Sequence, residues 1–391
     1  MKIIIAADSY KGNLTSLEVA NAIETGIVRT VADARCVKIP VADGGEGTVQ
    51  ALIDGLGGAF HFQQVQDPLG RPVRARYGLL PDNTAVIEMA EASGLPLLTP
   101  AEQNPLKTSS YGTGELILAA LEKGAERILI GLGGSATNDG GVGMAQALGI
   151  RFLDKQGQLL TENGTGGRLK HIAAIDMAGL HPAVLTTPIT IACDVSNPLC
   201  GKEGASVVFG PQKGASPEMV KQLDQNLQHL AKLIQQQFNL DIETLPGGGA
   251  AGGMGAGLVA FTGAHIANGF DTLASLTQLG ERIAGADLVI TGEGCVDFQT
   301  AFGKAPGGVA RLARSLNVPV IAIGGGLADD ANELLSENFD GLVSACARTM
   351  PLQEAIALST KHLANAAERM MRLLLIGGRI CSAELKPAAT P

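Results

Sequence analysis

Short runs of apolar and β-branched residues recur along the chain and predict β-strands. The runs are continuous rather than alternating, which is typical of strands buried on both faces of a parallel sheet. Stretches with a different periodicity separate most of them. The runs occupy residues 2–8, 36–43, 84–90, 127–134, 189–194, 205–210, 287–294, 318–326 and 340–346.

Between these runs, apolar residues recur at the spacing of one helix face. Residues 16–29 show this pattern, and Thr15 with Glu18 fits a capping box at the start of the helix. Ser216 followed by proline is typical of a helix N-cap, which predicts a helix over 217–237. The alternation of strands and helices indicates an α/β fold with a mainly parallel sheet. Further helices are predicted at 113–123, 304–316 and 352–375.

The chain of 391 residues is longer than one hydrophobic core usually supports, so two domains are expected. The first two and the last three strands predict βαβ units, whereas turn-rich segments such as 66–83 and a glycine block at 246–257 interrupt the middle. We therefore expect a flavodoxin- or Rossmann-like domain with a mainly parallel sheet, built from residues 1–65 and 265–391. A distinct α/β domain, residues 66–264, would be inserted into it.

Composition narrows the class of protein. Hydrophobic residues make up 46% of the chain and charged residues 17%, as in a folded globular protein. The net charge is −9, there is no basic run and 3% of residues are aromatic, which argues against nucleic-acid binding. No apolar run approaches the roughly 18 residues that span a membrane, and the six cysteines lack C-x-x-C spacing. We expect a cytoplasmic protein with reduced thiols that binds neither nucleic acid nor a membrane.

Carboxylates stand at the ends of several predicted strands. Asp8, Asp43 and Asp194 each end or follow such a run, and Glu293 and Asp297 follow a later one. A single aspartate at a strand end is usually a turn residue. Because ligands bind at the carboxyl ends of parallel strands, several carboxylates at one sheet edge instead indicate a Mg²⁺–nucleotide site.

The segment GLGGSATNDGGVG, residues 131–143, predicts a phosphate-binding loop made of backbone N–H groups and short side chains. A helix that begins near Asp139 would add the positive end of its dipole, and we interpret Asp139 as a helix-start residue rather than a metal ligand. The segment contains no lysine, so it differs from the P-loop and needs positive charge from elsewhere. The residues expected to bind phosphate are Gly133, Gly134, Ser135, Thr137 and Asn138.

Three basic residues are candidates for that charge. Lys11 follows the first strand, and Lys304 lies at the start of a predicted helix; either could neutralise phosphoryl oxygens, although each alone would be read as a solvated lysine. Lys304 or Arg71 could also hold a substrate carboxylate. Arg71, in DPLGRP, is equally readable as a turn residue.

Other catalytic motifs give weaker signals. A G-x-G-x-x-G stands at 247–252, but it follows a proline and no convincing strand, so a close-packed loop or hinge is favoured over a dinucleotide site. There is no Walker A motif, no G-x-S-x-G elbow and no protein-kinase motif set.

Taken together, these stretches resemble the type-1 glycerate kinase family in order and over nearly the whole chain. The resemblance implies two domains and transfer of phosphate from ATP, with Mg²⁺, to D-glycerate, giving 2-phosphoglycerate. The family usually has an arginine and then an aliphatic residue before the aspartate that follows TGEG, whereas this chain has Cys295 and Val296. The matching stretches are ADSYKGNLTSLEVANAI (7–23), PVADGGEGT (40–48), EASGLPLL (91–98), YGTGELI (111–117), GLGGSATNDGGVGM (131–144), ACDVSNPLCG (192–201), FGPQKGA (209–215), AAGGMGAGL (250–258) and TGEGCVDFQTAFGKAP (291–306).

For in-line phosphoryl transfer at a cleft between the two domains, each candidate residue receives a role. Asp194 is expected to act as base for the glycerate hydroxyl, and Lys11 and Lys304 to assist catalysis. Asp8 and Arg71 are expected to bind the substrate. The expected Mg²⁺ ligands are Glu293, Asp297 and Asp43.

Three alternatives stay open. The chain could be a kinase of another small hydroxy acid or sugar acid, or could give 3-phosphoglycerate. A nucleotide-binding regulatory protein without turnover is a third reading, for which Cys295 leaves room. The sequence does not reveal the oligomeric state, so a homodimer also stays open.

Overall fold

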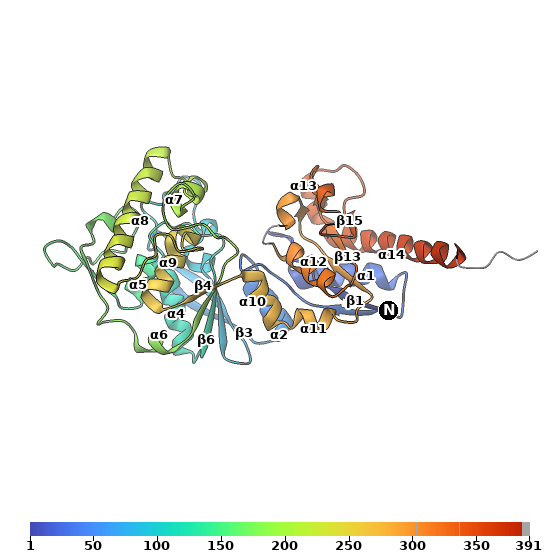
Figure 1. The fold of residues 1–391 in the computed structure, drawn as a ribbon, viewed down its shortest axis with the longest axis horizontal. Coiled ribbons are helices and arrows are strands. Elements are labelled where there is room, and N and C mark those ends of the chain that lie inside the picture. Colours follow the sequence, from blue (N-terminus) through green and yellow to red (C-terminus); the bar gives the residue numbers. More distant parts are fainter. Residues whose placement is uncertain (302–303, 336, 385–391) are drawn as a thin grey trace, which may run out of the picture. The chain divides into compact units, whose positions relative to one another are not determined.

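The computed structural model describes residues 1–301, 304–335 and 337–384. It is a mixed α/β structure with two compact units (Figure 1). Unit 1 comprises residues 1–42 and the chain from Leu273 onward, and unit 2 comprises Asp43–Thr272. Unit 2 is thus one continuous stretch, flanked in sequence by the two segments of unit 1.

Unit 1 is built on a parallel sheet of order β15-β13-β11-β1-β2. Numbered along the chain within this sheet, the order is 2-1-3-4-5, as in flavodoxin-like folds. Burial explains the continuous apolar runs, because Ile3, Ile4 and Ile5 are fully inaccessible to solvent. The strands are β1 (Lys2–Ile5), β2 (Arg35–Lys38), β11 (Leu288–Thr291), β13 (Val320–Gly324) and β15 (Gly341–Ser344), and a short ladder joins β12 (Cys295–Val296) to β14 (Gly326–Leu327).

The helices of unit 1 largely follow the predicted pattern. The first begins with the predicted capping box, in which the Glu18 N–H donates to Thr15 Oγ1 at 3.2 Å and the Thr15 N–H donates to Glu18 Oε2 at 2.8 Å. The helix predicted over 352–375 is instead two helices, interrupted at Leu358. The helices are α1 (Ser16–Val28), α11 (Leu279–Ile283), α12 (Ala305–Ser315), α13 (Leu352–Ala357) and α14 (Ser359–Glu384), and α10 (Gly269–Leu276) links the two units in sequence.

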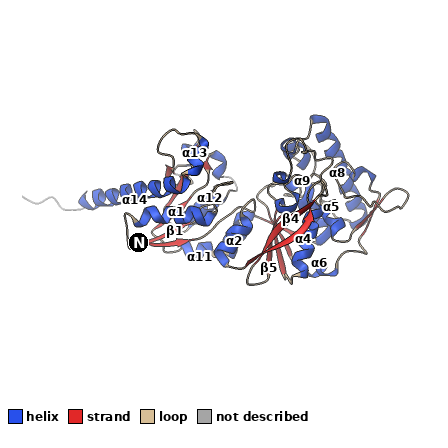
Figure 2. Cartoon of the chain, turned by 180° about the vertical axis from the view of Figure 1, so that it is seen from behind, coloured by secondary structure: helices blue, strands red, loops and turns tan. Residues whose placement is uncertain are grey.

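Unit 2 contains a six-stranded sheet of order β10-β9-β6-β5-β4-β3 (Figure 2). Its first four strands in that order are parallel, and β4 pairs antiparallel with both β5 and β3. The strands are β3 (Ala59–Gln66), β4 (Pro72–Leu79), β5 (Thr84–Glu88), β6 (Arg127–Gly131), β9 (Ile189–Ala192) and β10 (His265–Ala267), with a separate two-stranded antiparallel sheet of β7 (Arg151–Leu153) and β8 (Ala174–Asp176).

Helices pack against this sheet and bury a second core. The amphipathic α8 begins at the predicted Ser216 cap, whose Oγ accepts the Met219 N–H, and it buries Leu227, Leu230 and Ile234. The helices are α2 (Thr48–Leu56), α3 (Ala90–Ser93), α4 (Tyr111–Glu122), α5 (Val142–Ala147), α6 (Pro182–Thr186), α7 (Ala205–Phe209), α8 (Pro217–Phe238) and α9 (Ala250–Thr262).

Two local predictions are wrong. Residues 205–210 do not form a strand but contain helix α7, and Val207 and Val208 are 40% and 44% exposed rather than buried in a sheet. The segment 66–83, predicted as turn-rich, contains β4, which pairs with β3 along its whole length. These β3 and β4 sequences mix polar and apolar residues, so they lack the continuous apolar signal of a central strand.

The bounds of the two units also differ from the predicted ranges. Residues 43–65 belong to unit 2, because β3 pairs with β4, and residues 265–272 belong there because β10 pairs with β9. Strands near both ends of the chain lie in one sheet, and the domain ranges themselves stay a prediction.

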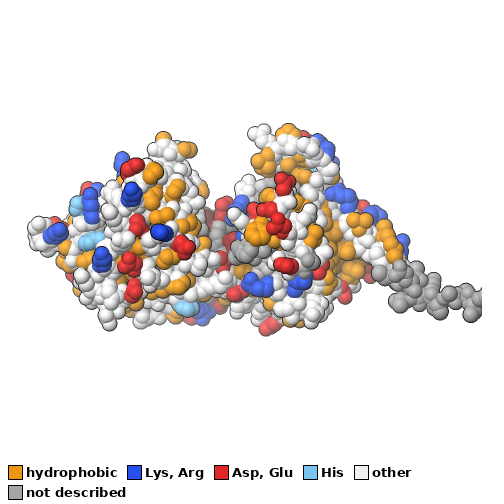
Figure 3. Space-filling model, turned by 45° about the horizontal axis from the view of Figure 1, so that its top comes forward, with side chains coloured by type: hydrophobic (Ala, Val, Ile, Leu, Met, Phe, Trp, Pro, Cys, Tyr) orange, Lys and Arg blue, Asp and Glu red, His pale blue; other side chains and the backbone are white. Residues whose placement is uncertain are grey.

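The surface of each unit carries both signs of charge. On the face seen in Figure 3, acidic and basic side chains are interspersed and separated by apolar and uncharged atoms. Within the described residues, no helix is both long and apolar enough to cross a membrane.

Candidate active site

The loop that follows β6 presents unpaired backbone N–H groups. Gly133 and Gly134 are exposed and Ser135 is buried, and the N–H groups of all three form no hydrogen bond within the described part of the chain. Gly134 has a φ of +73°, and a β-carbon on Gly133 would lie 2.8 Å from Gly45 Cα. Neither position therefore accommodates a side chain without strain. Successive N–H groups in such a turn form an anion-binding concavity.

A buried lysine contacts the side chain and backbone of this loop. Lys213, the last residue of the 3₁₀ turn η3 (Pro211–Lys213), is 1% exposed, and its Nζ donates to Ser135 Oγ at 2.8 Å and to Thr137 O at 2.7 Å. Burial lowers the pKa of Lys213 to about 7, against the opposing effect of Asp139. Lys213 is absent from the site residues predicted from sequence, although it lies in FGPQKGA, one of the family-like stretches. That stretch is the sequence feature from which Lys213 could have been selected as a site residue.

The remaining predicted phosphate ligands lie beneath the surface of the loop. Thr137 and Asn138 are fully buried, and Asn138 Nδ2 donates to Ser206 Oγ at 3.0 Å. Thr137 Oγ1 and Asn138 Oδ1 have no hydrogen-bond partner among the described residues. Direct contact of these two side chains with phosphate stays a prediction, while Gly133 and Gly134 are at the surface.

Asp139 caps two helices. Its Oδ2 accepts both the N–H and the hydroxyl of Ser110 at 2.8 Å, at the start of α4. At the start of α5, the Gly141 N–H donates to Oδ1 at 3.1 Å and the Gly143 N–H to Oδ2 at 3.3 Å. The helix-start interpretation of Asp139 is therefore correct. The helix begins at Val142, and the Asp139 carboxylate accepts N–H groups at its start, so a contribution of that helix dipole to phosphate binding stays a prediction.

Two aspartates converge in unit 2 after β9. Asp194 Oδ1 accepts the Gly269 N–H at 2.8 Å, whereas its buried Oδ2 has no partner within the described residues. Burial raises the pKa of Asp194 to about 6; the Gly269 and Phe270 N–H groups oppose this rise and the charge of Asp43 adds to it. Asp43 Oδ1 itself accepts the Gly45 N–H at 2.9 Å. An aspartate with a raised pKa and an unpaired oxygen can accept a proton from a hydroxyl group.

Backbone contacts place the Asp43 loop against the phosphate loop. β6 pairs with β9, with Gly131 opposite Ala192. A β-carbon on Gly44 would lie 2.8 Å from Ala192 O, and one on Gly131 would lie 2.2 Å from Gly44 O. Unit 2 thus brings Asp43 and Asp194 together with the unpaired N–H groups.

Asp194 also lines a pocket within unit 2. The pocket has a volume of about 530 Å³, which is ample for a three-carbon acid and lies in the range of small-molecule sites. Its walls are formed by residues 193–196, 245–247 and 264–268 together with Val259.

In unit 1, two carboxylates share one lysine. Lys304 Nζ lies 3.3 Å from Glu293 Oε2 and 3.4 Å from Asp297 Oδ1. Thr300 Oγ1 donates to Glu293 Oε1 at 2.7 Å and accepts the Asp297 N–H at 3.0 Å. Burial raises the pKa of Glu293, and Asp297 adds to the rise. Burial lowers the pKa of Lys304, but Glu293 and Asp297 outweigh it, so that this pKa is raised.

The carboxylate pair fits a divalent cation. The oxygens of Glu293 and Asp297 already converge on one positive charge, and Mg²⁺ commonly binds one or two carboxylates together with phosphates and water. Within residues 1–301, 304–335 and 337–384, no three His, Cys, Asp or Glu side chains gather as a ready-made metal site. Asp43 belongs to unit 2, so its part in metal binding stays a prediction. Cys295 is exposed and adds no positive charge beside the pair.

Asp8 and Lys11 follow β1 in unit 1. The Asp8 N–H donates to Gly292 O at 2.8 Å, which places Asp8 next to the Glu293 segment at the carboxyl edge of the sheet. Asp8 is 4% exposed and its Oδ1 accepts the Ser9 N–H. Lys11 is exposed. Asp8, Lys11, Glu293, Asp297 and Lys304 therefore all belong to unit 1.

Arg71 lies in unit 2 and its guanidinium is already engaged. It donates to Asp67 Oδ2 at 2.6 Å, to Glu102 Oε1 at 2.6 Å and to Leu97 O at 3.3 Å. The Arg71 N–H also donates to Asp67 Oδ1. These contacts favour the turn-residue interpretation over a substrate ligand.

The glycine block of α9 packs against the phosphate loop. Gly252 has a φ of +70°, and a β-carbon there would lie 2.1 Å from Thr137 O. The Gly140 N–H donates to Gly252 O at 3.0 Å. The G-x-G-x-x-G at 247–252 is thus a close-packed segment that supports the loop.

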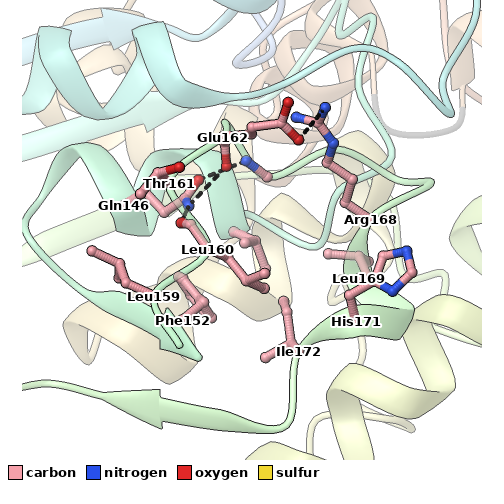
Figure 4. A pocket seen from close by; sticks show the side chains of 12 residues that line it. Gln146, Phe152, Leu159, Leu160, Thr161, Glu162, Arg168, Leu169, His171 and Ile172 are labelled. Atoms are coloured by element: carbon pink, nitrogen blue, oxygen red, sulfur yellow. Dashed lines mark hydrogen bonds and ion pairs between the residues drawn. The ribbon is translucent and has the colours of Figure 1, made fainter. Parts of the chain in front are cut away.

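A second pocket in unit 2 has a different character. Its volume is about 340 Å³, its base is apolar, and the Glu162–Arg168 ion pair lies at its edge (Figure 4). Gln146 Nε2 donates to the carbonyls of Leu160 and Glu162, so this side chain holds the segment that borders the pocket. None of the residues that line it is a predicted site residue.

Comparison with known proteins gives the family. The model of the glycerate kinase family matches residues 3–375. The chain is 47% identical to the glycerate 2-kinase of Escherichia coli K12, over 97% of this chain and 99% of that protein. It is 48% identical to the glycerate kinase of Bacillus subtilis 168, over 95% of this chain and 96% of that protein. A crystal structure from Salmonella typhimurium LT2, assigned as a glycerate kinase 2, matches with a TM-score of 0.87 at 48% identity, with 97% of this chain and 99% of that chain covered. The chain therefore belongs to the glycerate kinase family and is a kinase, a phosphotransferase that takes an alcohol group as acceptor.

Proposed function

We propose that this kinase phosphorylates D-glycerate with ATP and gives 2-phosphoglycerate. The observation that carries the proposal is the arrangement after β6 and β9, where unpaired loop N–H groups lie in one unit with Asp194, whose Oδ2 is unpaired among the described residues. Phosphoryl transfer to a hydroxyl needs both an anion-binding loop and a group that accepts the hydroxyl proton. The product follows the name of the E. coli relative, a glycerate 2-kinase.

In this mechanism, unit 2 binds phosphate and removes the proton. The N–H groups of residues 133–135 and the Ser135 hydroxyl donate to phosphate oxygens. Asp194 accepts the proton of the glycerate hydroxyl while that oxygen forms a bond to the γ-phosphorus, and the bond to the β–γ bridging oxygen breaks to release ADP. A pKa of about 6 makes Asp194 a stronger base than an ordinary aspartate and leaves it mainly ionised near pH 7.

Unit 1 supplies the charges that transfer requires. Glu293 and Asp297 would hold Mg²⁺, with Asp43 as a further candidate ligand. When bound, this ion neutralises charge on the β- and γ-phosphates. Lys304 and Lys11 offset the charge of the transferring group, and Asp8 orients the substrate.

Proton-coupled ³¹P NMR of the product from D-glycerate, ATP and Mg²⁺ tests the proposal. A phosphate on C2 couples to one proton and gives a doublet, whereas a phosphate on C3 couples to two protons and gives a triplet. A triplet would assign 3-phosphoglycerate instead. ADP release with other hydroxy or sugar acids but not with glycerate would assign a different substrate. Nucleotide binding without acceptor-dependent ADP release would assign a regulatory role.

A further inference from the structure

The buried position of Lys213 lowers the stability of the protein, so a functional reason for it is expected. Its side chain is fully enclosed, yet its Nζ contacts a hydroxyl and a carbonyl rather than a carboxylate. A buried ammonium without an ion pair lowers stability, and an apolar side chain of similar length would fill the same space at lower cost. A compensating negative charge that arrives with a ligand would explain why a lysine occupies this position.

The loop that Lys213 contacts is anchored on two sides. Along one side, the Leu95 N–H donates to Gly134 O at 2.9 Å and the Ala136 N–H donates to Ser93 O at 2.9 Å. On the other, Lys213 ties the side chain of Ser135 to the backbone of Thr137. These contacts use carbonyl and side-chain groups and the N–H of residue 136, so the N–H groups of residues 133–135 stay unpaired among the described residues.

We propose that Lys213 is a positioning residue for phosphoryl transfer, which holds Ser135 and Thr137 so that the N–H groups of residues 133–135 face the anionic phosphates of the nucleotide. This inference rests on the proposed function. Lys213 acts through the loop and is not itself in contact with the reacting atoms.

The direction of one hydrogen bond gives the proposal a measurable consequence. While the charged Lys213 donates to Ser135 Oγ, the Ser135 hydroxyl proton is available to a phosphate oxygen. A neutral amine could accept that proton instead, which would turn the hydroxyl away from the anion. The charged form of Lys213 therefore strengthens phosphate binding, and bound phosphate in turn stabilises the charged form. By linkage, nucleotide binding near neutral pH takes up protons.

Few other charges surround this lysine. Asp139, from the loop, acts on Lys213 and favours its charged form. Gln103, whose carbonyl packs against Gly214, is preceded by Glu102. The charge of Glu102 is paired with Arg71. Helix α7, which packs against η3, contains no titratable residue. Lys213 is thus expected to contribute the proton uptake that Lys213→Met removes, apart from any uptake by Asp194, whose pKa is about 6.

Isothermal titration of ADP at pH 7.0 and pH 8.5, in two buffers of different ionisation enthalpy, tests the proposal on the full chain. Wild type should take up protons at pH 7.0 and bind ADP more weakly at pH 8.5. Lys213→Met should lose the proton uptake and bind ADP about tenfold or more weakly, with a matching rise in the KM for ATP. Lys213→Arg should restore part of the affinity without the pH dependence. Lys221→Met, at an exposed position of α8, is the matched control and should behave as wild type.

The results separate this inference from the proposed function. Unchanged ADP affinity and unchanged proton uptake in a folded Lys213→Met protein would overturn the role of Lys213, whatever its activity. If Lys213→Met does not fold, Ser135→Ala replaces it, since it removes the side-chain contact and leaves the lysine. Wild-type affinity and proton uptake in Ser135→Ala would then refute the proposal. Absence of glycerate phosphorylation by wild type would instead refute the proposed function, and ADP binding would still report on Lys213.

Discussion

Glu88, at the end of β5, offers a test of how the loop that contains Asp43 is held. Glu88 is 5% exposed, and its carboxylate accepts the N–H groups of Val49 and Gly47 at the start of α2. The N-cap residue of that helix is Gly47, which has no side chain, so the helix has no side-chain cap of its own. Burial raises the pKa of Glu88 from 4.5 to about 7, although the two N–H groups oppose the rise.

A raised pKa of an acid fixes the sign of its effect on stability. The native protein binds the Glu88 proton more tightly than the unfolded chain does. The contribution of this proton to the free energy of unfolding is therefore complete below pH 4.5 and is lost as the pH rises through about 7. The two pKa values differ by 7 − 4.5, or about 2.5, and one unit corresponds to about 1.36 kcal/mol. The contribution is therefore about 3 kcal/mol at most.

Glu88→Gln removes this titration and keeps an acceptor oxygen for α2. Urea denaturation followed by circular dichroism should show little difference from wild type at pH 4.5. At pH 8 the variant should be more stable, by up to about 3 kcal/mol. Glu203→Gln, at an exposed position of unit 2, should show no such dependence. A Glu88→Gln protein that is less stable than wild type at pH 8 would show that the carboxylate cap outweighs the burial cost, and would refute this reasoning.

Three further predictions address the site. Asp194→Asn should lower kcat by about 10²-fold or more if Asp194 is the base, and a wild-type kcat would remove it from the chemistry. Glu293→Gln should raise the Mg²⁺ concentration needed for half-maximal activity by about tenfold or more, whereas an unchanged Mg²⁺ titration would place the metal elsewhere. Gly252→Ala should destabilise the chain by more than Gly263→Ala. Both positions have positive φ, near +70° and +71°, but only at Gly252 would the β-carbon meet a backbone carbonyl, so equal losses would contradict the close packing.

Local chemistry made several elements predictable from sequence. The capping box of Thr15 and Glu18 and the Ser216 cap followed by proline define helix starts through contacts within a few residues. Continuous apolar runs such as 2–8 identified central strands because those strands are buried on both faces. Asp139 was correctly read as a helix-start residue for the same local reason, although its contact with Ser110 spans distant residues.

The errors arose where tertiary context decides the outcome. Residues 205–209 include two β-branched valines, yet they form a helix between Gly204 and Gly210 in which both valines are exposed. The β3 strand is partly exposed and mixes His and Gln with aromatic residues, so its signal is weak without its partner β4. The role of Arg71 stays a prediction: its contact with Asp67 is local, but its partner Glu102 lies 31 residues away and is not apparent from the sequence.

Lys213 explains why the phosphate loop matches no standard motif. In a P-loop the lysine belongs to the loop and reaches the phosphates directly. Here the lysine lies 78 residues from Ser135, and both of its contacts are with the loop itself, so it shapes the anion site without direct contact with a ligand. Charge in direct contact with the transferring group must then come from other residues. Lys11 and Lys304 belong to unit 1, whereas the loop and Asp194 belong to unit 2. We propose that Lys11 and Lys304 supply this charge.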